Sequence, residues 1–306
     1  MKKNGFHSMS KFKSWISACR LRTLPLSVSG VIVGASLAYS RGVFDSAVCV
    51  LTIFTTLSLQ ILSNLANDYG DGIKGTDNEH RIGPERALQS GIISPKEMRN
   101  AIIFNVVICF SLVLSLIYQA FGQDQFFSSV VFVVLGILAI VAAIKYTVGS
   151  SAYGYKALGD LMVFLFFGWL SVLGSYFLYA KQIDILMLLP ASSIGLLSAA
   201  VLNLNNMRDL ESDKLSKKHT LAGYLGSKKS KHYHLFVVTL ALLLMLIYPL
   251  NNSSVSTVFL LAGCLPLFIH MYRVWHIKDP VKYDPQLKVL ALSTVGMALL
   301  FMASLL

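Results

Sequence analysis

Uninterrupted apolar stretches recur along the whole chain, and they restrict its fold more than any other feature. The segment VVFVVLGILAIVAAI at 130–144 carries no charge and does not alternate between polar and apolar residues. About 20 such residues cross a bilayer as an α-helix, whereas a transmembrane β-barrel uses strands of about 10 residues with alternating polarity. Charged residues make up only 13% of the sequence, against about 25% in an ordinary soluble domain. An all-α polytopic membrane protein is therefore predicted.

The positions of the apolar runs predict about nine transmembrane helices around a central cavity. We expect them at approximately 24–41, 46–66, 101–121, 126–146, 159–180, 184–204, 235–250, 254–274 and 287–305. We interpret residues 1–306 as a single membrane-embedded domain, in which residues 1–20 form a basic cytoplasmic N-terminal segment.

The distribution of positive charge predicts the orientation of the chain. Of the 26 Lys and Arg residues, all except Arg41 and Lys181 fall in segments that a nine-span topology places on one face. Segments rich in Lys and Arg remain in the cytoplasm, so the N-terminus and the basic loops are expected there. This topology, together with attraction to anionic headgroups or substrates, accounts for the net charge of +11. A nucleic-acid partner is not needed to explain it.

Two acidic groups follow predicted spans on the cytoplasmic side, and each combines one asparagine with two aspartates. If the helices continue beyond the membrane edge, spacings of i, i+4, i+7 and of i, i+4, i+8 place each trio on one helix face. Like charges at such spacing repel, so a bound cation would stabilise them. Hard oxygen donors suit Mg²⁺, and Mn²⁺ is also possible. The two predicted metal-ligand trios are Asn64, Asp68, Asp71 and Asn205, Asp209, Asp213, and we take the four aspartates as the catalytic residues.

The two acidic groups occupy equivalent places in the chain. Asn64 and Asn205 lie 205 − 64 = 141 positions apart and close the second and sixth predicted spans. We infer two pseudo-repeated four-helix halves, followed by one further helix. One acidic cluster at a membrane edge is more commonly a solvated loop or a helix cap, but two clusters in matching places favour ligand binding.

Basic residues surround both acidic groups. Arginine binds phosphate oxygens bidentately and lysine acts as a point charge, so a metal-bound diphosphate would fit such loops. Cytoplasmic topology alone also accounts for each single base. The bases in these loops are Lys74, Arg81, Arg86, Arg208, Lys214, Lys217 and Lys218.

Five segments together resemble the UbiA-type intramembrane prenyltransferases. They are RLRTLPLSVSG (20–30), NLANDYGDGIKGTD (64–77), RIGPERALQSG (81–91), YGYKALGD (153–160) and NNMRDLESDKLSKKHTLAGYLG (205–226). The third and fourth segments resemble the branch of the family that acts on 1,4-dihydroxy-2-naphthoate in menaquinone biosynthesis.

The resemblance implies a reaction and its partners. Mg²⁺, held by the two acidic trios, would bind a polyprenyl diphosphate, and the polyprenyl group would pass to 1,4-dihydroxy-2-naphthoate with loss of diphosphate and CO₂. The product would be demethylmenaquinone, made in the bacterial cytoplasmic membrane among its lipids. The wider family often has an aspartate where this chain has Gly75, and whether Asp77 substitutes for it is left open.

Further residues are candidates for binding the two substrates. Cationic or hydrogen-bonding partners for the naphthoate carboxylate would be Arg22, Lys145, Tyr146, Tyr153 and Tyr155. Tyrosines at a membrane edge are also common interfacial anchors. Asp160, which ends the YGYKALGD segment, would orient a base, accept a proton or cap a helix. The full substrate-binding prediction is Arg22, Asn64, Lys74, Arg81, Lys145, Tyr146, Tyr153, Tyr155, Asp160, Asn205, Arg208 and Lys218.

Three alternatives remain open on the sequence. The acceptor could be 4-hydroxybenzoate, homogentisate or haem B. A secondary transporter would use intramembrane acids for coupling ions, although such sites usually lie near the bilayer midplane rather than at helix ends. A CDP-alcohol phosphotransferase also uses aspartates and Mg²⁺, but its single long aspartate motif is absent.

Overall fold

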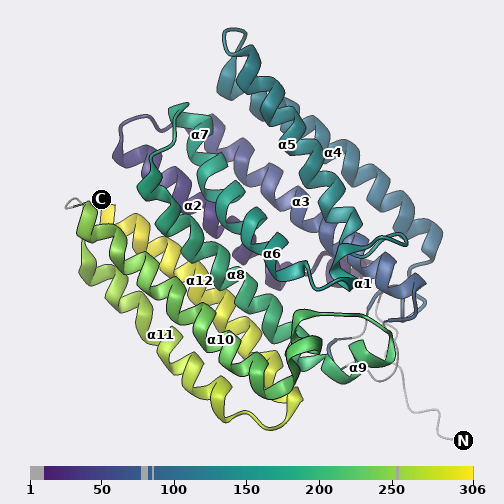
Figure 1. Cartoon of the computed structure of the whole chain (residues 1–306). Helices are drawn as coiled ribbons and strands as arrows, with labels where there is room; N and C mark the ends of the chain where they lie inside the picture. Colours follow the sequence, from purple (N-terminus) through teal and green to yellow (C-terminus); the bar gives the residue numbers. More distant parts are fainter. Residues whose placement is uncertain (1–9, 77–81, 85, 253–254, 306) are drawn as a thin grey trace, which may run out of the picture.

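Long helices make up most of the chain and pack side by side in a bundle (Figure 1). The computed structural model describes residues 10–76, 82–84, 86–252 and 255–305, and these residues contain no β-strand. The α-helices are α1 (Lys11–Cys19), α2 (Leu24–Ser40), α3 (Ser46–Ile73), α4 (Pro95–Phe121), α5 (Phe126–Lys145), α6 (Gly159–Val163), α7 (Ser175–Ala180), α8 (Leu188–Arg208), α9 (Leu210–Leu215), α10 (Leu221–Ile247), α11 (Thr257–His276) and α12 (Tyr283–Leu305). A π-helix, η3 (Phe164–Gly174), joins α6 to α7, and short 3₁₀ turns are η1 (Leu21–Thr23), η2 (Tyr153–Tyr155), η4 (Ile185–Met187), η5 (Tyr248–Asn251) and η6 (Pro280–Lys282).

The predicted all-helical membrane fold is confirmed. Within the described ranges, 8 helices are long and apolar enough to cross a membrane. The first predicted span corresponds to α2, which has 17 residues and reaches the required length only together with α1, across a bend of 40°. The chain is therefore a multi-pass membrane protein, with eight or nine spans among the residues that the structure describes.

Several helices extend beyond the predicted apolar runs because polar residues continue them outside the membrane. Helix α4 begins at Pro95 rather than at 101, since Ser94 and Glu97 form a reciprocal capping box. Helix α10 begins at Leu221 rather than at 235, where the Thr220 side chain accepts a hydrogen bond from the N–H of Gly223, and it is kinked at Gly226, whose φ of 72° and ψ of 168° are not helical. Polar helix ends carry no hydropathy signal, so the apolar runs underestimated both helices.

Helix α8 lies at the centre of the bundle, whereas α5 lies at its periphery. In the most apolar stretch of Ile185–Arg208, which contains α8, 56% of the residues are buried, whereas in that of α5 the share is only 17%. Gly168 of η3 and Gly195 of α8 allow the two backbones to touch, because a Cβ at Gly168 would lie 2.7 Å from the Gly195 Cα. Small residues permit this close approach in membrane helix pairs.

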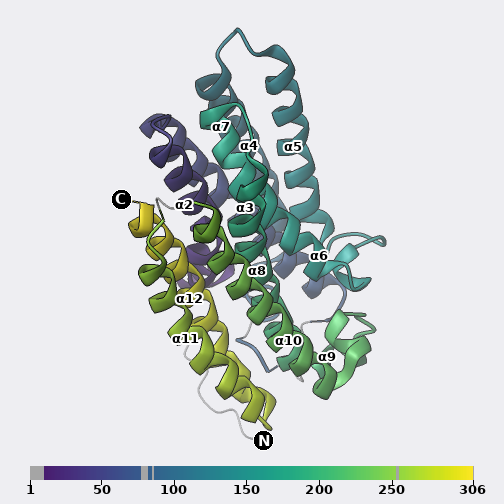
Figure 2. The same ribbon diagram turned by 60° about the vertical axis from the view of Figure 1, so that its left-hand side comes forward.

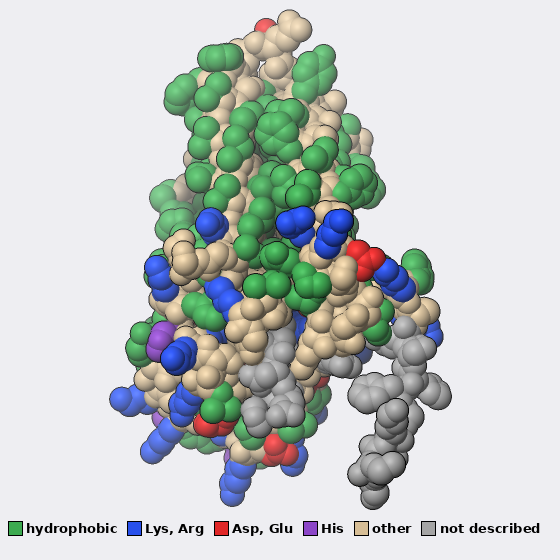
Figure 3. Space-filling view, turned by 90° about the vertical axis from the view of Figure 1, so that its right-hand side faces the viewer, with side chains coloured by type: hydrophobic (Ala, Val, Ile, Leu, Met, Phe, Trp, Pro, Cys, Tyr) green, Lys and Arg blue, Asp and Glu red, His purple; other side chains and the backbone are tan. Residues whose placement is uncertain are grey.

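Charge separates the two ends of the molecule. In Figures 1 and 2 the hairpin of α4 and α5 extends beyond the other helices at the end opposite α9. Figure 3 shows hydrophobic side chains covering this hairpin and Lys and Arg gathered towards the opposite end. The apolar band matches a lipid-facing surface, and the basic end is the one that carries both acidic groups.

Candidate functional site

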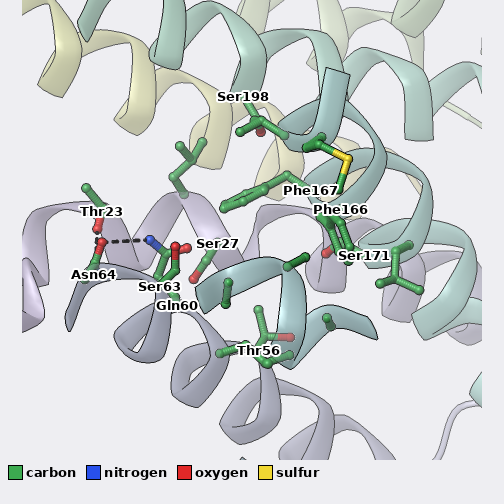
Figure 4. Close-up of a pocket in the computed structure, with 18 of the residues that line it drawn as sticks. Thr23, Ser27, Thr56, Gln60, Ser63, Asn64, Phe166, Phe167, Ser171 and Ser198 are labelled. Atoms are coloured by element: carbon green, nitrogen blue, oxygen red, sulfur yellow. Dashed lines mark hydrogen bonds between the residues drawn. The ribbon is translucent and has the colours of Figure 1, made fainter. Parts of the chain in front are cut away.

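A cavity of about 520 Å³ lies between the helices of the bundle. One part is polar and is lined by Asn64, Asp71, Asn205 and Lys218. Figure 4 shows the next part, where polar side chains of α2 and α3 and phenylalanines of η3 face the same space. Elsewhere the wall is apolar and includes Phe132 of α5. The cavity therefore offers an ionic end and an apolar interior.

The first two members of the α3 trio hold neighbouring chain segments in place. Asn64, only 2% exposed, donates from Nδ2 to the Cys19 carbonyl at 2.9 Å and to the Thr23 hydroxyl at 3.3 Å. The Asp68 carboxylate, 1% exposed, accepts the backbone N–H groups of Ala87 and Leu88 at 3.1 and 3.2 Å. Asp68 thus positions the loop after residue 86, and it does not line the cavity.

Asp71, the third member, points to the centre of the site. Its Oδ1 accepts a hydrogen bond from the Tyr155 hydroxyl at 2.7 Å, and its Oδ2 lies 3.5 Å from the Lys218 Nζ. The same ammonium lies 4.0 Å from Oδ1 of Asp213. One cation therefore bridges the last aspartates of the two trios.

Electrostatics keep this bridging lysine charged. Burial disfavours the ammonium of Lys218, but the carboxylates of Asp71 and Asp213 outweigh it and raise the pKa above the ordinary lysine value. Burial, followed by the charge of Asp71, also raises the pKa of Tyr155, which therefore remains a hydrogen-bond donor at neutral pH.

The second trio lies where the helix is interrupted. Helix α8 ends at Arg208, and Asp209 has φ −94° and ψ 14° before α9 begins. The N–H of Asp213 still donates to the Asp209 carbonyl at 2.8 Å. The expected continuous helix is therefore wrong at this point, although the i, i+4 relation between the two aspartates persists.

Arg208 is buried against acids of its own chain. Its guanidinium, 0% exposed as a side chain, donates to both carboxylate oxygens of Asp209 at 2.9 and 2.6 Å. It also donates to Asp284 of α12 at 2.6 Å and to Asn205 Oδ1 at 2.8 Å. These contacts join α8, α9 and α12, and they give Arg208 a structural role whether or not it also contacts substrate.

A loop carrying three predicted tyrosines closes one side of the site. The rings of Tyr146 and Tyr153 pack edge to face with centroids 5.3 Å apart, and the Lys74 ammonium lies 4.0 Å from the Tyr155 ring centroid. The backbone N–H of Ala157 donates to the His219 carbonyl at 2.8 Å. This bond joins the tyrosine loop to the segment that carries Lys218.

Some of the predicted substrate and metal residues line the cavity and others do not. Those that line the cavity are Asn64, Asp71, Tyr146, Tyr153, Asn205 and Lys218. Those that do not line it are Asp68, Lys74, Lys145, Tyr155, Asp160, Arg208, Asp209 and Asp213, of which Lys145 is exposed and Asp160 accepts a hydrogen bond from Tyr233 at 3.3 Å. Arg81, Asp77 and the side chain of Arg22 lie outside the described part of the structure.

Several polar cavity residues were not predicted as substrate ligands, and four of them are large polar or charged side chains of interest. Arg20 and Asn67 stand beside predicted residues inside the quoted motifs, and Arg86 was noted only as a loop base. Lys288 lies in α12, in a run without any motif. Position in the sequence does not distinguish a side chain that faces the cavity from its neighbour.

The carboxylate and amide oxygens of the two trios are of the kind that binds a divalent cation. The described residues contain no group of three or more His, Cys, Asp and Glu gathered as a ready metal site. However, the Asp71 and Asp213 carboxylates already share the positive Lys218 ammonium between them. A pair of carboxylates that leaves the remaining ligands to substrate phosphates is a common arrangement for Mg²⁺.

Known proteins share the sequence pattern of this chain. The model of the UbiA prenyltransferase family matches residues 27–293. The chain belongs to the UbiA family. The resemblance drawn from the five motifs is confirmed.

Two bacterial members of the family are similar over nearly their whole length. The 1,4-dihydroxy-2-naphthoate octaprenyltransferase of Escherichia coli (strain K12) is 43% identical over 92% of this chain and 91% of its own. The protein of the same name from Haemophilus influenzae is 41% identical over 97% of this chain and 96% of its own.

Solved structures of UbiA homologues share the fold. A homologue from Archaeoglobus fulgidus bound to GPP and Mg²⁺ has a TM-score of 0.69 at 13% identity and covers 95% of this chain and 99% of its own. The apo structure of a homologue from Aeropyrum pernix K1 has a TM-score of 0.69 at 16% identity, with coverages of 92% and 98%. At these identities the likeness concerns the arrangement of helices.

Proposed function

We propose that this protein transfers a polyprenyl group from a polyprenyl diphosphate to 1,4-dihydroxy-2-naphthoate, with release of diphosphate and CO₂, giving demethylmenaquinone. The observation that carries the proposal is that Asp71 and Asp213 both lie beside Lys218, at the ionic end of a cavity whose interior is apolar. The two relatives named for this activity, which are similar across almost the entire chain, support the choice of acceptor.

The ionic end suits a diphosphate. When bound, Mg²⁺ would neutralise charge that develops on the diphosphate as the allylic C–O bond breaks. Asp71 and Asp213, with amide oxygens of the two trios, would hold the ion, and Mn²⁺ is a possible substitute. Lys218 and Arg86 would bind phosphate oxygens directly, because both line the cavity.

The apolar part of the cavity suits the other half of the same substrate. Its wall, with Phe132, Phe166 and Phe167, would hold the isoprenoid tail and exclude water. Water would otherwise capture the allylic cation left after C–O cleavage. The electron-rich naphthoate ring attacks this cation, and the new C–C bond replaces the bond to the carboxylate, whose electrons return to the ring as CO₂ leaves.

The naphthoate ring would reach the cation from the tyrosine side of the site. Tyr146 and Tyr153 line the cavity and present aromatic surface suited to stacking. We also propose that the ionic end faces the cytoplasm, in the bacterial cytoplasmic membrane among its lipids, because the basic residues gather at that end.

Turnover of defined substrates tests the proposal. The purified protein is incubated with 1,4-dihydroxy-2-naphthoate and octaprenyl diphosphate, with Mg²⁺ or with EDTA, and demethylmenaquinone and CO₂ are followed by mass spectrometry. Both products are expected with Mg²⁺, and neither with EDTA. The Glu211→Gln variant is the control for the site variants, since this glutamate lies in α9 with an 81% exposed side chain.

The alternatives give different results in the same assay. Prenylation of 4-hydroxybenzoate or homogentisate, but not of the naphthoate, would retain the chemistry and overturn the acceptor. Absence of product from every acceptor in a panel would contradict a prenyltransferase and favour transport.

A further inference from the structure

Four basic side chains of the described residues line the cavity, and three of them act on the carboxylate of Asp71. Lys218 lies 3.5 Å from Asp71, and the charges of Arg86 and Arg20 also act on that carboxylate. These three therefore belong to the ionic end, where the diphosphate is proposed to bind. The fourth cation, Lys288, is not among the charges that act on Asp71.

Lys288 projects from α12, on the part of the wall formed by the second half of the chain. It lies four residues, or about one helical turn, after Asp284, and both line the cavity. Asp284 is engaged by the buried guanidinium of Arg208 at 2.6 Å. No carboxylate among the described residues lies within ion-pair distance of the Lys288 ammonium.

A cation that lines the cavity without a carboxylate partner among the described residues can pair with an anion that binds there. The Lys288 side chain is exposed, so the ammonium stays hydrated until an anion displaces that water. The proposed reaction brings two anionic groups into the cavity, namely the diphosphate and the ring carboxylate of the acceptor. Among the described cations, the other three are assigned to the first, which leaves Lys288 for the second.

We propose that Lys288 binds the carboxylate of the aromatic acceptor and thereby selects acceptors that carry one. This inference rests on the proposed function, and it adds a residue outside both acidic motifs. A lysine is suited to the task because its flexible stem extends over apolar surface while the charged end reaches the ligand. The competing explanation is that Lys288, which is exposed, only contacts solvent or lipid headgroups.

Steady-state kinetics test the assignment through a difference between substrates. In Lys288→Gln the KM for 1,4-dihydroxy-2-naphthoate should rise about tenfold or more, as expected for loss of a charged hydrogen bond. The KM for octaprenyl diphosphate should stay within about twofold, and Lys288→Arg should recover most of the loss. Lys282→Gln is the matched control, because Lys282 lies in η6, is exposed and does not line the cavity.

Ligand binding tests the same point without turnover. Calorimetry in detergent compares 1-hydroxy-2-naphthoate with 1-naphthol, which lacks the carboxylate. Lys288→Gln should weaken binding of the first about tenfold and leave the second unchanged. Equal changes for both ligands, no change for either, or a rise in the diphosphate KM alone would overturn the assignment. If the wild-type protein makes no product from the naphthoate, the proposed function fails, and calorimetry still decides whether Lys288 binds a carboxylate.

Discussion

The two acidic helix ends share a sequence pattern but use its middle aspartate differently. Asp68 accepts neutral backbone N–H groups of Ala87 and Leu88, whereas Asp209 is engaged by the charged guanidinium of Arg208. Only the last aspartates, Asp71 and Asp213, converge on a common partner. A repeated motif therefore does not mean repeated roles, because the surroundings of each copy decide which acid remains for a ligand.

The largest expected effect is on turnover, and it tests the last aspartates, which have the same partner at both acidic helix ends. Asp71→Asn and Asp213→Asn should each lower kcat by about 10²–10³-fold, because each removes one negative charge from the proposed cation site. The amount of protein inserted in the membrane should match that of Glu211→Gln. Turnover with Mg²⁺ and quantitative immunoblots of membranes measure the two quantities. Near-normal turnover in either variant would show that the two ends are not equivalent at the centre of the site.

The second effect is on stability, and it tests the middle aspartates, whose partners differ between the two acidic helix ends. Asp209→Asn should lower the free energy of unfolding by on the order of 3 kcal/mol, because it weakens the pairing of a fully buried arginine. Asp68→Asn should cost about 1 kcal/mol, since the amide oxygen still accepts one backbone hydrogen bond. Thermal unfolding in detergent ranks the two variants, with Asp124→Asn as control at the exposed opposite end. A larger loss for Asp68→Asn would reverse the assignment of structural roles.

The smallest expected effect is the pH dependence of the stabilisation by Lys218, the lysine that lies between the two acidic helix ends. Its folded-state pKa is raised, so its stabilising contribution is fully present below the unfolded lysine value of about 10.4 and is lost as pH rises above that. The difference in melting temperature between the wild type and Lys218→Met should therefore stay constant between pH 7 and about 9. A difference that disappears within this range would contradict a charged Lys218 held by two carboxylates.

The sequence predicted the fold well because lipid imposes a simple rule on it. Long apolar runs such as 130–144 must be helices in a bilayer, and the predicted and observed spans agree closely except where polar residues lengthen a helix. The start of α10 at Leu221 is such a case, since no run of apolar residues begins there.

The site could be predicted only as a list of residue types at a membrane edge. Spacing along α3 correctly put Asn64, Asp68 and Asp71 on one continuous helix. Whether an acid faces the cavity or a neighbouring backbone depends on partners that are distant in sequence, as with Asp68 and the loop 19 residues later. The same limit applies to Arg208, because no local pattern indicates its pairing with Asp284, which lies 76 residues later in the chain.

The backbone hydrogen bond between Ala157 and His219 ties the tyrosine loop to the segment of Lys218. A ligand that shifts one of these segments must therefore shift the other or break the bond. If the diphosphate and the aromatic ring each settle one segment, the affinity of each depends on the presence of the other, and by the same factor in both directions. The two substrates would then bind cooperatively, and this hydrogen bond would contribute to the coupling between them.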